Sequence, residues 1–247
     1  HKMPSTSKKI SIAVDIGGTL TDIVLADRST NSFFVTKTSS TPDNPAVGFF
    51  EAIDSVIKLS NANKEDIEIV FHGSTVATNA ILENKGVKTA LITSKGFRHV
   101  LEIGRAEIPR EANLYGWTKP KRPVLPRDIF EISERVRSDG SVARPLNKAD
   151  LESVVTTISK GGYEAVAICL MHSYMNSAHE QIIDDFVKKN LPGLEVSISS
   201  DVLPVFREYE RTMATVMNAM VQPLVGKYVS QLEAGLKERN IQAPMLI

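Results

Sequence analysis

Two apolar runs flanking a Gly-Gly-Thr turn constrain this chain more than any other stretch of its sequence. The first run includes Asp15, the turn comprises Gly17, Gly18 and Thr19, and the second run starts at Leu20. This pattern predicts two antiparallel strands joined by a tight hairpin, because adjacent glycines tolerate turn conformations and carry no Cβ. Bare backbone N–H groups at such a tip form a concave nest that suits a phosphate. An ordinary hairpin with a permissive turn is the alternative.

The side chains around the turn favour the phosphate interpretation. Asp15 precedes the turn, and Thr21 and Asp22 follow it closely. Mg²⁺ is a hard cation that takes one or two carboxylates together with phosphate oxygens. We therefore expect Asp15 to lie next to a magnesium ion and the turn to hold a phosphate.

Composition narrows the class of protein. Among the 247 residues, 29 are Lys or Arg and 29 are Asp or Glu, so no bulk charge attracts nucleic acid or an anionic membrane. The lone Cys169 excludes an intrachain disulfide framework and a cysteine-rich metal site. No apolar run approaches membrane-spanning length, and residues 1–9 lack the apolar region of a signal peptide. These features predict a soluble, cytoplasmic protein.

The first third of the chain has the element order of a mixed sheet. Turn residues separate three short apolar strands, and Asn44 with Pro45 marks the start of a helix. The predicted strands are 10–16, 20–26, 33–38, 67–71 and 88–93, with helices from Asn44, over 75–83 and after Gly96. We expect the first three strands to be antiparallel and the later ones parallel, through right-handed crossovers.

A second α/β stretch follows a proline-rich loop over 103–128 that contains Trp117. Asn147 is expected to cap a helix, and Ser177 with Glu180 has the spacing of a capping box. Strands are predicted at 165–170 and 195–199, followed by a long helix from about Arg207 that Pro223 must kink or divide, and by the opening of a strand at 243–247. Because the chain stops inside that last apolar run, we expect a fragment of a longer polypeptide, preceded at 1–9 by a tag or disordered arm.

Other chemistry-bearing residues give weaker signals. His72 ends a predicted strand, where ligands collect in α/β sheets, but a structural histidine is equally compatible. Thr75 and Asn79 open the next helix, where plain capping is the alternative. Arg105 follows a glycine and can present its guanidinium to a phosphate or carboxylate, although most lone arginines are merely solvated. The charges from Arg207 to Arg211 are expected to pair within their helix. Serine-hydrolase, Walker and dinucleotide-binding motifs are not found.

The segment from Asp15 to Asp22 resembles the first phosphate loop of the actin-like ATPase superfamily, which has a ribonuclease-H-like sheet. More narrowly, the chain resembles the N-terminal part of the hydantoinase A / 5-oxoprolinase family, which includes acetone and acetophenone carboxylase subunits. The segments that carry this resemblance begin at His72, Leu91, Leu101, His172 and Val202. Leu20 and Ser74 depart from the family's usual Phe and Thr, and the family's second phosphate loop does not occur in this sequence.

The resemblance implies an ATP-dependent hydrolase of hydantoin- or 5-oxoproline-type cyclic amides, in which ATP activates the amide oxygen for ring opening. The nucleotide-binding subunit of a ketone carboxylase is the alternative, and an ATP-gated activator or scaffold and a sugar or acyl kinase are further ones. The roles carried over are Asp15 as catalytic, Mg²⁺-proximal residue, His72 as catalytic residue, Gly17, Gly18 and Thr19 as phosphate cradle, Thr21 and Asp22 as supporting residues, and Thr75, Asn79 and Arg105 as substrate or coupling residues.

The resemblance also divides the chain and names its partners. Residues 10–200 correspond to the family's N-terminal α/β region, and 201–247 to the helical start of a second, nucleotide-binding lobe. The expected partners are a small-molecule substrate, the remainder of the polypeptide and a hydantoinase B-type subunit or domain. One lobe alone is expected to be inactive.

Overall fold

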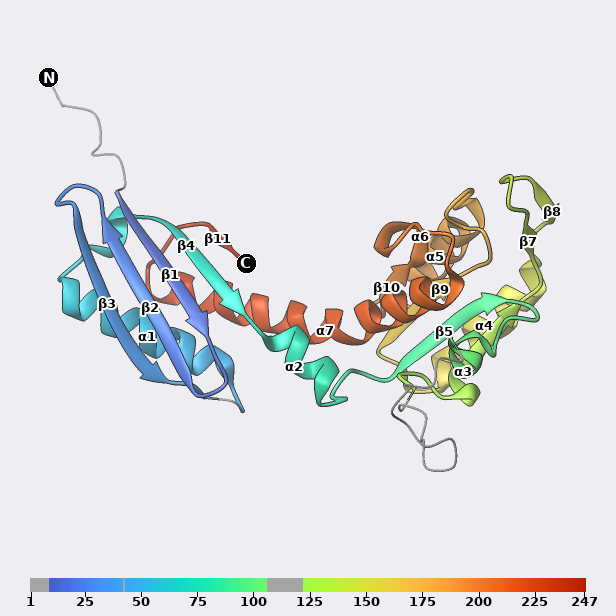
Figure 1. The fold of residues 1–247 in the computed structure, drawn as a ribbon, viewed down its shortest axis with the longest axis horizontal. Helices are drawn as coiled ribbons and strands as arrows, with labels where there is room; N and C mark the ends of the chain where they lie inside the picture. The colour runs from blue at the N-terminus through green and yellow to red at the C-terminus, as the bar shows by residue number, and fades with distance from the viewer. Residues whose placement is uncertain (1–8, 42, 106–121) are drawn as a thin grey trace, which may run out of the picture. The chain divides into compact units, whose positions relative to one another are not determined.

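The computed structural model describes residues 9–41, 43–105 and 122–247. The chain divides into two compact units, one formed by His1–Asn79 with Val225–Ile247 and the other by Ala80–Leu224 (Figure 1). Residues 1–8 of the arm predicted at 1–9, and most of the proline-rich stretch, including Trp117, lie outside the described residues.

The first unit contains a five-stranded mixed sheet. The antiparallel strands β1 (Ile10–Ile16), β2 (Leu20–Asp27) and β3 (Ser32–Ser39) follow the predicted ranges closely. Strands β4 (Ile67–Ser74) and β11 (Met245–Leu246) run parallel to β1, which gives the order β11-β4-β1-β2-β3. Residues in β1 alternate between buried and exposed or partly exposed positions, as expected for a strand with one face on the core.

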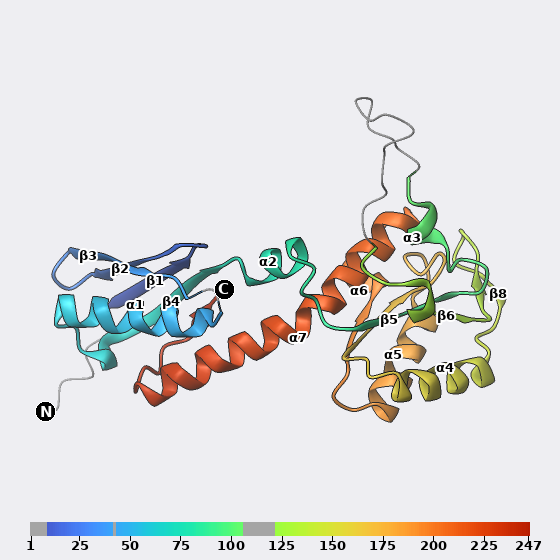
Figure 2. The ribbon, with the colours of Figure 1, turned by 90° about the horizontal axis from the view of Figure 1, so that it is seen from below.

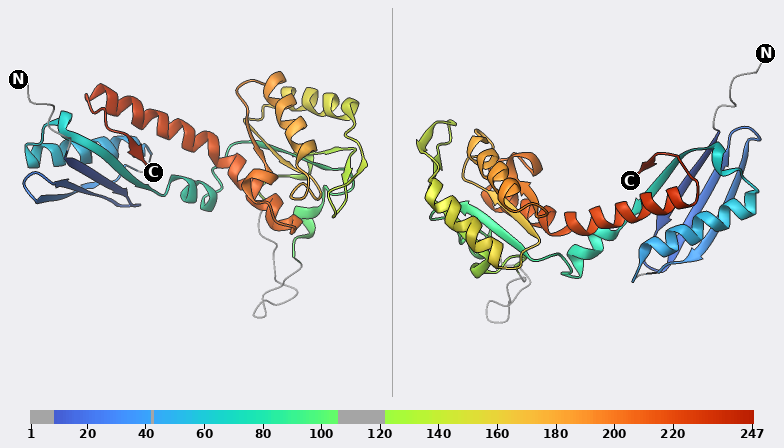
Figure 3. Two further views of the ribbon diagram at one scale, coloured as in Figure 1. Left: turned by 90° about the horizontal axis from the view of Figure 1, so that it is seen from above. Right: turned by 180° about the vertical axis from the view of Figure 1, so that it is seen from behind.

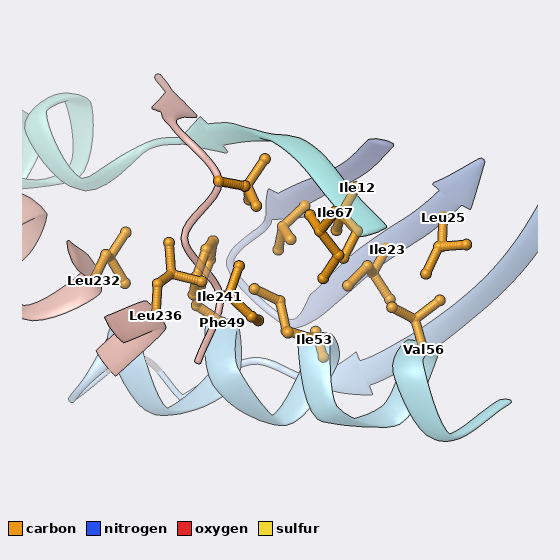
Figure 4. Close-up of a cluster of buried hydrophobic side chains, with 14 of the residues drawn as sticks. Ile12, Ile23, Leu25, Phe49, Ile53, Val56, Ile67, Leu232, Leu236 and Ile241 are labelled. Carbon is orange, nitrogen blue, oxygen red and sulfur yellow. The ribbon is translucent and has the colours of Figure 1, made fainter. Parts of the chain in front are cut away.

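Two helices cover one face of this sheet. Helix α1 (Pro45–Ser60) and the second half of α7 (Glu208–Glu238) pack their apolar side chains against β1, β2 and β4 (Figure 4). The core includes Ile12, Ile23, Leu25, Phe49, Ile53, Val56, Ile67, Leu232, Leu236 and Ile241. On the opposite face the side chains of Phe33, Val35, Phe71 and Leu246 are exposed.

The second unit has an all-parallel sheet covered on both faces. Strands β5 (Thr89–Ser94), β6 (Ile129–Ile132), β9 (Ala165–Cys169) and β10 (Glu195–Ile198) pair in the order β10-β9-β5-β6. Helices α4 (Lys148–Lys160) and α5 (Ala178–Asn190) pack on one face (Figures 2 and 3), and α3 (Val100–Ile103) with the first half of α7 on the other. Every residue of β5 and β9 is buried, and burial on both faces explains why β9 is a continuous apolar run.

Short elements complete the described chain. They are α2 (Val76–Leu82), α6 (Ser199–Val202), the hairpin β7 (Arg135–Val136) and β8 (Val142–Arg144), and the 3₁₀ turns Lys64–Asp66 and Pro126–Asp128.

The predicted fold class is confirmed, since a mixed sheet with three antiparallel strands is followed by a second α/β stretch. The strand predicted at 88–93 belongs to the second sheet, whereas the edge of the first sheet is completed by β11. The units also divide at other places than residue 200, because the second half of α7 and β11 pack with β1 and β4. The second unit is therefore an insertion between two parts of the first.

Of the helix caps predicted from the sequence, one is confirmed and others are not. The cap at Asn147 is confirmed, since its side chain accepts a hydrogen bond from the backbone N–H of Asp150 at 3.1 Å. Asn44 makes no such bond, and the hydroxyl of Thr41 instead accepts from the backbone N–H of Gly48 at 2.9 Å. The capping box was wrong, because the carboxylate of Glu180 is buried and binds the backbone N–H groups of Leu170 and Ser200.

Two further expectations concern α7 and Cys169. Helix α7 continues through Pro223 as one element, so the proline does not divide it. Cys169 is buried, as its strand pattern predicted, and burial raises the pKa of its thiol. In the part of the chain that the structure describes, no helix has the length and apolar character needed to span a membrane.

Two glycines of α7 give a matched test of the packing of the first unit. A Cβ at Gly235 would fall on the ring of Phe50, whereas a Cβ at Gly226 meets nothing within 4 Å. We expect Gly235→Ala to lower the free energy of unfolding by about 1–2 kcal/mol through overpacking. Gly226→Ala should raise it by roughly 0.5–1 kcal/mol, because alanine favours a helix. Urea unfolding measures both, and a stabilised Gly235→Ala would contradict the packing of α7 on α1.

Candidate functional site

Four residues form a row across the outer face of the first sheet. In the strand register, Gly73 of β4 lies beside Asp15 of β1, Asp15 beside Asp22 of β2, and Asp22 beside Lys37 of β3. Asp22 and Lys37 form an ion pair of 2.8 Å. The adjacent carboxylates of Asp15 and Asp22 repel one another, and Lys37 neutralises only the charge of Asp22. The row therefore leaves the negative charge of Asp15 without a described cationic partner.

The absence of a side chain at Gly73 leaves room for the carboxylate of Asp15. A Cβ on Gly73 would come within 2.7 Å of Oδ1 of Asp15, closer than real Cβ contacts. Both residues border an open hollow of about 410 Å³, whose lining also includes Phe71 and Leu246. Asp15 thus faces an accessible space on the sheet surface. Sequence reasoning had missed Gly73, because the demand for a glycine arises only from its register with Asp15.

The turn between β1 and β2, residues 17–19, is open to solvent at its tip. Neither glycine has its φ in the left-handed region, so the backbone conformation alone does not require glycine at either position. A Cβ on Gly17 would approach the carbonyl oxygen of Leu20 to 3.0 Å, whereas a Cβ on Gly18 would meet nothing within 4 Å. Gly17 is therefore explained by close packing, and the space at Gly18 is free for a ligand.

A hydroxyl network fixes the base of this turn. Thr21 is fully buried, and its hydroxyl lies 3.0 Å from that of Ser40. Ser40 Oγ donates to the carbonyl oxygen of Gly17 at 2.8 Å, and its backbone N–H donates to that of Thr19 at 2.9 Å. Thr21 consequently supports the turn from below. Ser40 had been missed, because a serine after a strand carries no distinctive sequence signal.

A cation at this site would depend on Asp15 and on the oxygens of a ligand. Among the described residues there is no group of three or more His, Cys, Asp or Glu side chains arranged to hold a metal ion. One exposed carboxylate next to a second one fits a largely hydrated Mg²⁺, which takes few protein ligands.

His72 lies beneath the row, on the buried side of the sheet. It is 4% exposed and packs edge-on against Phe49 with ring centroids 4.9 Å apart. Its Nδ1 is 3.2 Å from the carbonyl oxygen of Val14, and its Nε2 is 2.8 Å from the hydroxyl of Tyr228. Both ring nitrogens are thus engaged within the core, and a catalytic role for His72 stays a prediction.

Thr75 and Asn79 are exposed at the start of α2. The side-chain amide of Asn79 donates to the hydroxyl of Thr75 at 3.2 Å, and Ser74 Oγ accepts from the backbone N–H of Val76 at 3.3 Å. These contacts are those of a capped helix start, and a substrate role for the two residues stays a prediction.

Arg105 lies in the second unit, where it pairs with Glu210 of α7. Its Nε donates to Oε1 of Glu210 at 2.7 Å, and this hydrogen bond lowers the pKa of that carboxyl group. Arg211 is 1% exposed and donates to Ser173 Oγ and to the carbonyl oxygen of Leu170. Of the charges expected to pair within the helix, Glu210 and Arg211 therefore bind partners outside it.

Comparison with known proteins adds the family. The profile of the hydantoinase/oxoprolinase N-terminal region matches residues 11–191. The chain belongs to the hydantoinase/oxoprolinase family. Its relatives include the caprolactamase alpha subunit of Pseudomonas jessenii, 32% identical over 245 residues, and the acetophenone carboxylase gamma subunit of Aromatoleum aromaticum, 30% identical over 229 residues.

The family also shares this fold. The crystal structure of the ATP-dependent caprolactamase from Pseudomonas jessenii superposes with a TM-score of 0.86 at 31% identity, over 95% of this chain. The match to the caprolactamase subunit includes 97% of this chain and 35% of that subunit. The match to the carboxylase subunit includes 86% of this chain and 31% of that subunit, so the chain spans about a third of the length of these relatives. The predicted family is thereby confirmed for the region that carries the Gly-Gly-Thr turn.

Replacing Gly73 tests the geometry of Asp15 in this family member. Gly73→Ala should turn the Asp15 carboxylate away from β4, because the new methyl group would lie 2.7 Å from its present oxygen position. The side chain of Asp15 is exposed and can move, so we expect the free energy of unfolding to change by no more than about 1 kcal/mol. A crystal structure of the variant with Asp15 in place would contradict this account.

Proposed function

We propose that this chain supplies the ATP-phosphate-binding lobe of an ATP-dependent hydrolase that opens cyclic amides. The observation that carries the proposal is the open space at Gly18 next to an exposed Asp15, on a turn whose base is fixed by Ser40. Fixed backbone donors at an accessible turn are what a phosphate requires, since preorganised N–H groups cost nothing to reorient on binding.

Each residue of the site has a role in this proposal. Gly18 and Thr19 offer backbone N–H groups to the terminal phosphate, whereas the N–H of Gly17 donates to the carbonyl oxygen of Leu20 at 3.0 Å and closes the turn. Thr21 holds the turn in place through Ser40. Asp15 holds the hydration shell of a Mg²⁺ ion, with Asp22 as the adjacent carboxylate. The ion, when bound, neutralises charge on the phosphates.

The chemistry follows from the stability of amides. Resonance makes the amide carbon a poor electrophile, and transfer of the γ-phosphoryl group to the amide oxygen removes that protection. The new bond joins the amide oxygen to phosphorus as the bond to the β-phosphate oxygen breaks and ADP leaves. Water then adds to the activated carbon, and the ring C–N bond breaks, which leaves an amine that takes up a proton and an acyl phosphate. A second water hydrolyses the acyl phosphate to a carboxylate and inorganic phosphate. The task of this lobe is to position and orient the phosphates.

Two relatives are named for different reactions, so the substrate that ATP activates has to be determined by experiment. Caprolactamase is named for a cyclic amide and acetophenone carboxylase for a ketone. We favour the amide because the family profile is named for hydantoinase and oxoprolinase. Assaying the complete polypeptide with its partner subunit and Mg·ATP on hydantoin, 5-oxoproline, caprolactam and acetone separates the two. Turnover of acetone with bicarbonate but of no cyclic amide would favour the carboxylase.

A nucleotide-gated activator or scaffold is the further alternative. It predicts ATP-dependent binding of the partner subunit that persists when no substrate is turned over, whereas the hydrolase predicts ADP formation coupled to ring opening.

Affinity for ATP should be low in this chain alone. Three or four hydrogen bonds to a charged phosphate contribute roughly 1.5–3 kcal/mol each at best. Association and ordering cost about 4–15 kcal/mol and offset much of that gain. We expect a dissociation constant for Mg·ATP of about a millimolar or weaker, measured by calorimetric titration. Micromolar binding would show that one lobe suffices.

A pair of substitutions tests the turn itself. Gly18→Val should weaken Mg·ATP binding by about tenfold or more, because its side chain occupies the space expected to receive the phosphate, while the melting temperature stays within a few degrees. Asp15→Asn should weaken binding in the presence of Mg²⁺ and much less in its absence. Unchanged affinity in Gly18→Val would refute phosphate binding at this turn.

A further inference from the structure

Tyr228 places a polar group inside the apolar core of the first unit. It lies on the part of α7 that packs on α1 and the sheet, and it is 6% exposed. Its hydroxyl is 2.8 Å from Nε2 of His72, whose Nδ1 is 3.2 Å from the carbonyl oxygen of Val14. Three groups from α7, β4 and β1 therefore form one line of hydrogen bonds.

The partners fix the direction of these bonds. A carbonyl oxygen only accepts, so Nδ1 of His72 carries the proton that Val14 receives. Burial is the main cause of a lowered pKa of His72, opposed by the Val14 bond and the charge of Asp15. The neutral ring then has a lone pair on Nε2, and Tyr228 donates to it. Burial raises the pKa of Tyr228 to about 12, so the phenol keeps its proton at neutral pH.

The line of bonds ends next to Asp15. Val14 and His72 are register partners in the parallel pair, and the next partners are Asp15 and Gly73. The carbonyl group of Val14 belongs to the peptide bond that leads into Asp15. His72 thus acts on this peptide from the buried face of the sheet, while Gly73 leaves room for the carboxylate on the open face.

We propose that Tyr228 and His72 are positioning residues, which hold the Val14–Asp15 peptide and so orient the Asp15 carboxylate for its ligand. The proposal deepens the proposed function and rests on it for the identity of that ligand. It assigns to Tyr228 of α7, which lies outside every motif recognised in the sequence, a link to the phosphate-binding strand. It also explains a histidine at the end of β4 without a free ring nitrogen.

Removal of one hydroxyl tests the proposal. In Tyr228→Phe we expect the dissociation constant for Mg·ATP, followed by NMR titration of the 247-residue chain, to rise about threefold to tenfold. The matched control is Tyr163→Phe in the second unit, where Tyr163 donates to Oδ1 of Asp128 at 2.7 Å and its pKa is likewise raised to about 12 by burial. Both variants lose one hydrogen-bonded phenol hydroxyl, but only Tyr228→Phe should lose affinity.

A double-mutant cycle separates positioning from general loosening of the fold. If Tyr228 acts through Asp15, then Tyr228→Phe should change the affinity of an Asp15→Asn protein by less than about twofold. An equal loss in both backgrounds would overturn the proposal. His72→Asn repeats the test from the middle of the relay, because its amide can donate to Val14 but offers no ring nitrogen to Tyr228. His72→Asn should lower the affinity for Mg·ATP in the protein that retains Asp15 and leave it unchanged in the Asp15→Asn protein.

A measurement without nucleotide distinguishes failure of the relay from failure of the proposed function. In the free protein, Tyr228→Phe should shift the side-chain carboxyl ¹³C resonance of Asp15, and Tyr163→Phe should leave it in place. If the wild-type chain binds no Mg·ATP, the proposed function fails and this resonance still decides the relay. If the resonance is unmoved in Tyr228→Phe, the relay is refuted even where Mg·ATP binds.

Discussion

The parallel pairing of β1 with β4 is the constraint on which the candidate site depends. It sets Asp15 beside Gly73 on the open face and Val14 beside His72, whose ring lies on the buried face. Because side chains alternate along a strand, a slip of one residue would bury the carboxylate and expose the apolar partners of α1. The cost of burying an unpaired charge makes that slip prohibitive. The same pattern that forms the core therefore aims Asp15 at the hollow.

Local chemistry made part of each unit predictable. Glycines and polar residues delimit β1, β2 and β3, and Asn147 caps its helix as its spacing with Asp150 predicted. What the sequence could not reveal depends on contacts between distant segments. Glu180 has the spacing of a capping-box residue, yet its carboxylate accepts from the backbone N–H of Leu170, directly after β9, and from that of Ser200 in α6. Strand β11 joins β4 across more than 170 residues, and no local signal marks that pairing.

In the candidate site, too, some features could be predicted from adjacent residues and others depend on distant segments. The turn at residues 17–19 and Asp15 could be recognised because their chemistry is written in adjacent residues. The groups that fix their geometry are Ser40 directly after β3, Gly73 in β4 and Tyr228 in α7. Each is an ordinary residue in its own segment and acquires its role through a partner elsewhere in the fold. His72 shows the converse, since a residue type associated with acid–base chemistry has both nitrogens engaged in the core.

The central claim is that the turn between β1 and β2 receives the terminal phosphate of ATP. The most direct measurement is a ¹⁵N NMR titration of the chain with Mg·ATP and, in parallel, with Mg·AMP. The account predicts that the backbone amide resonances of Gly18 and Thr19 move with the triphosphate and stay in place with the monophosphate. Resonances at the turn that are unaffected by Mg·ATP, or that move equally with both nucleotides, would contradict it.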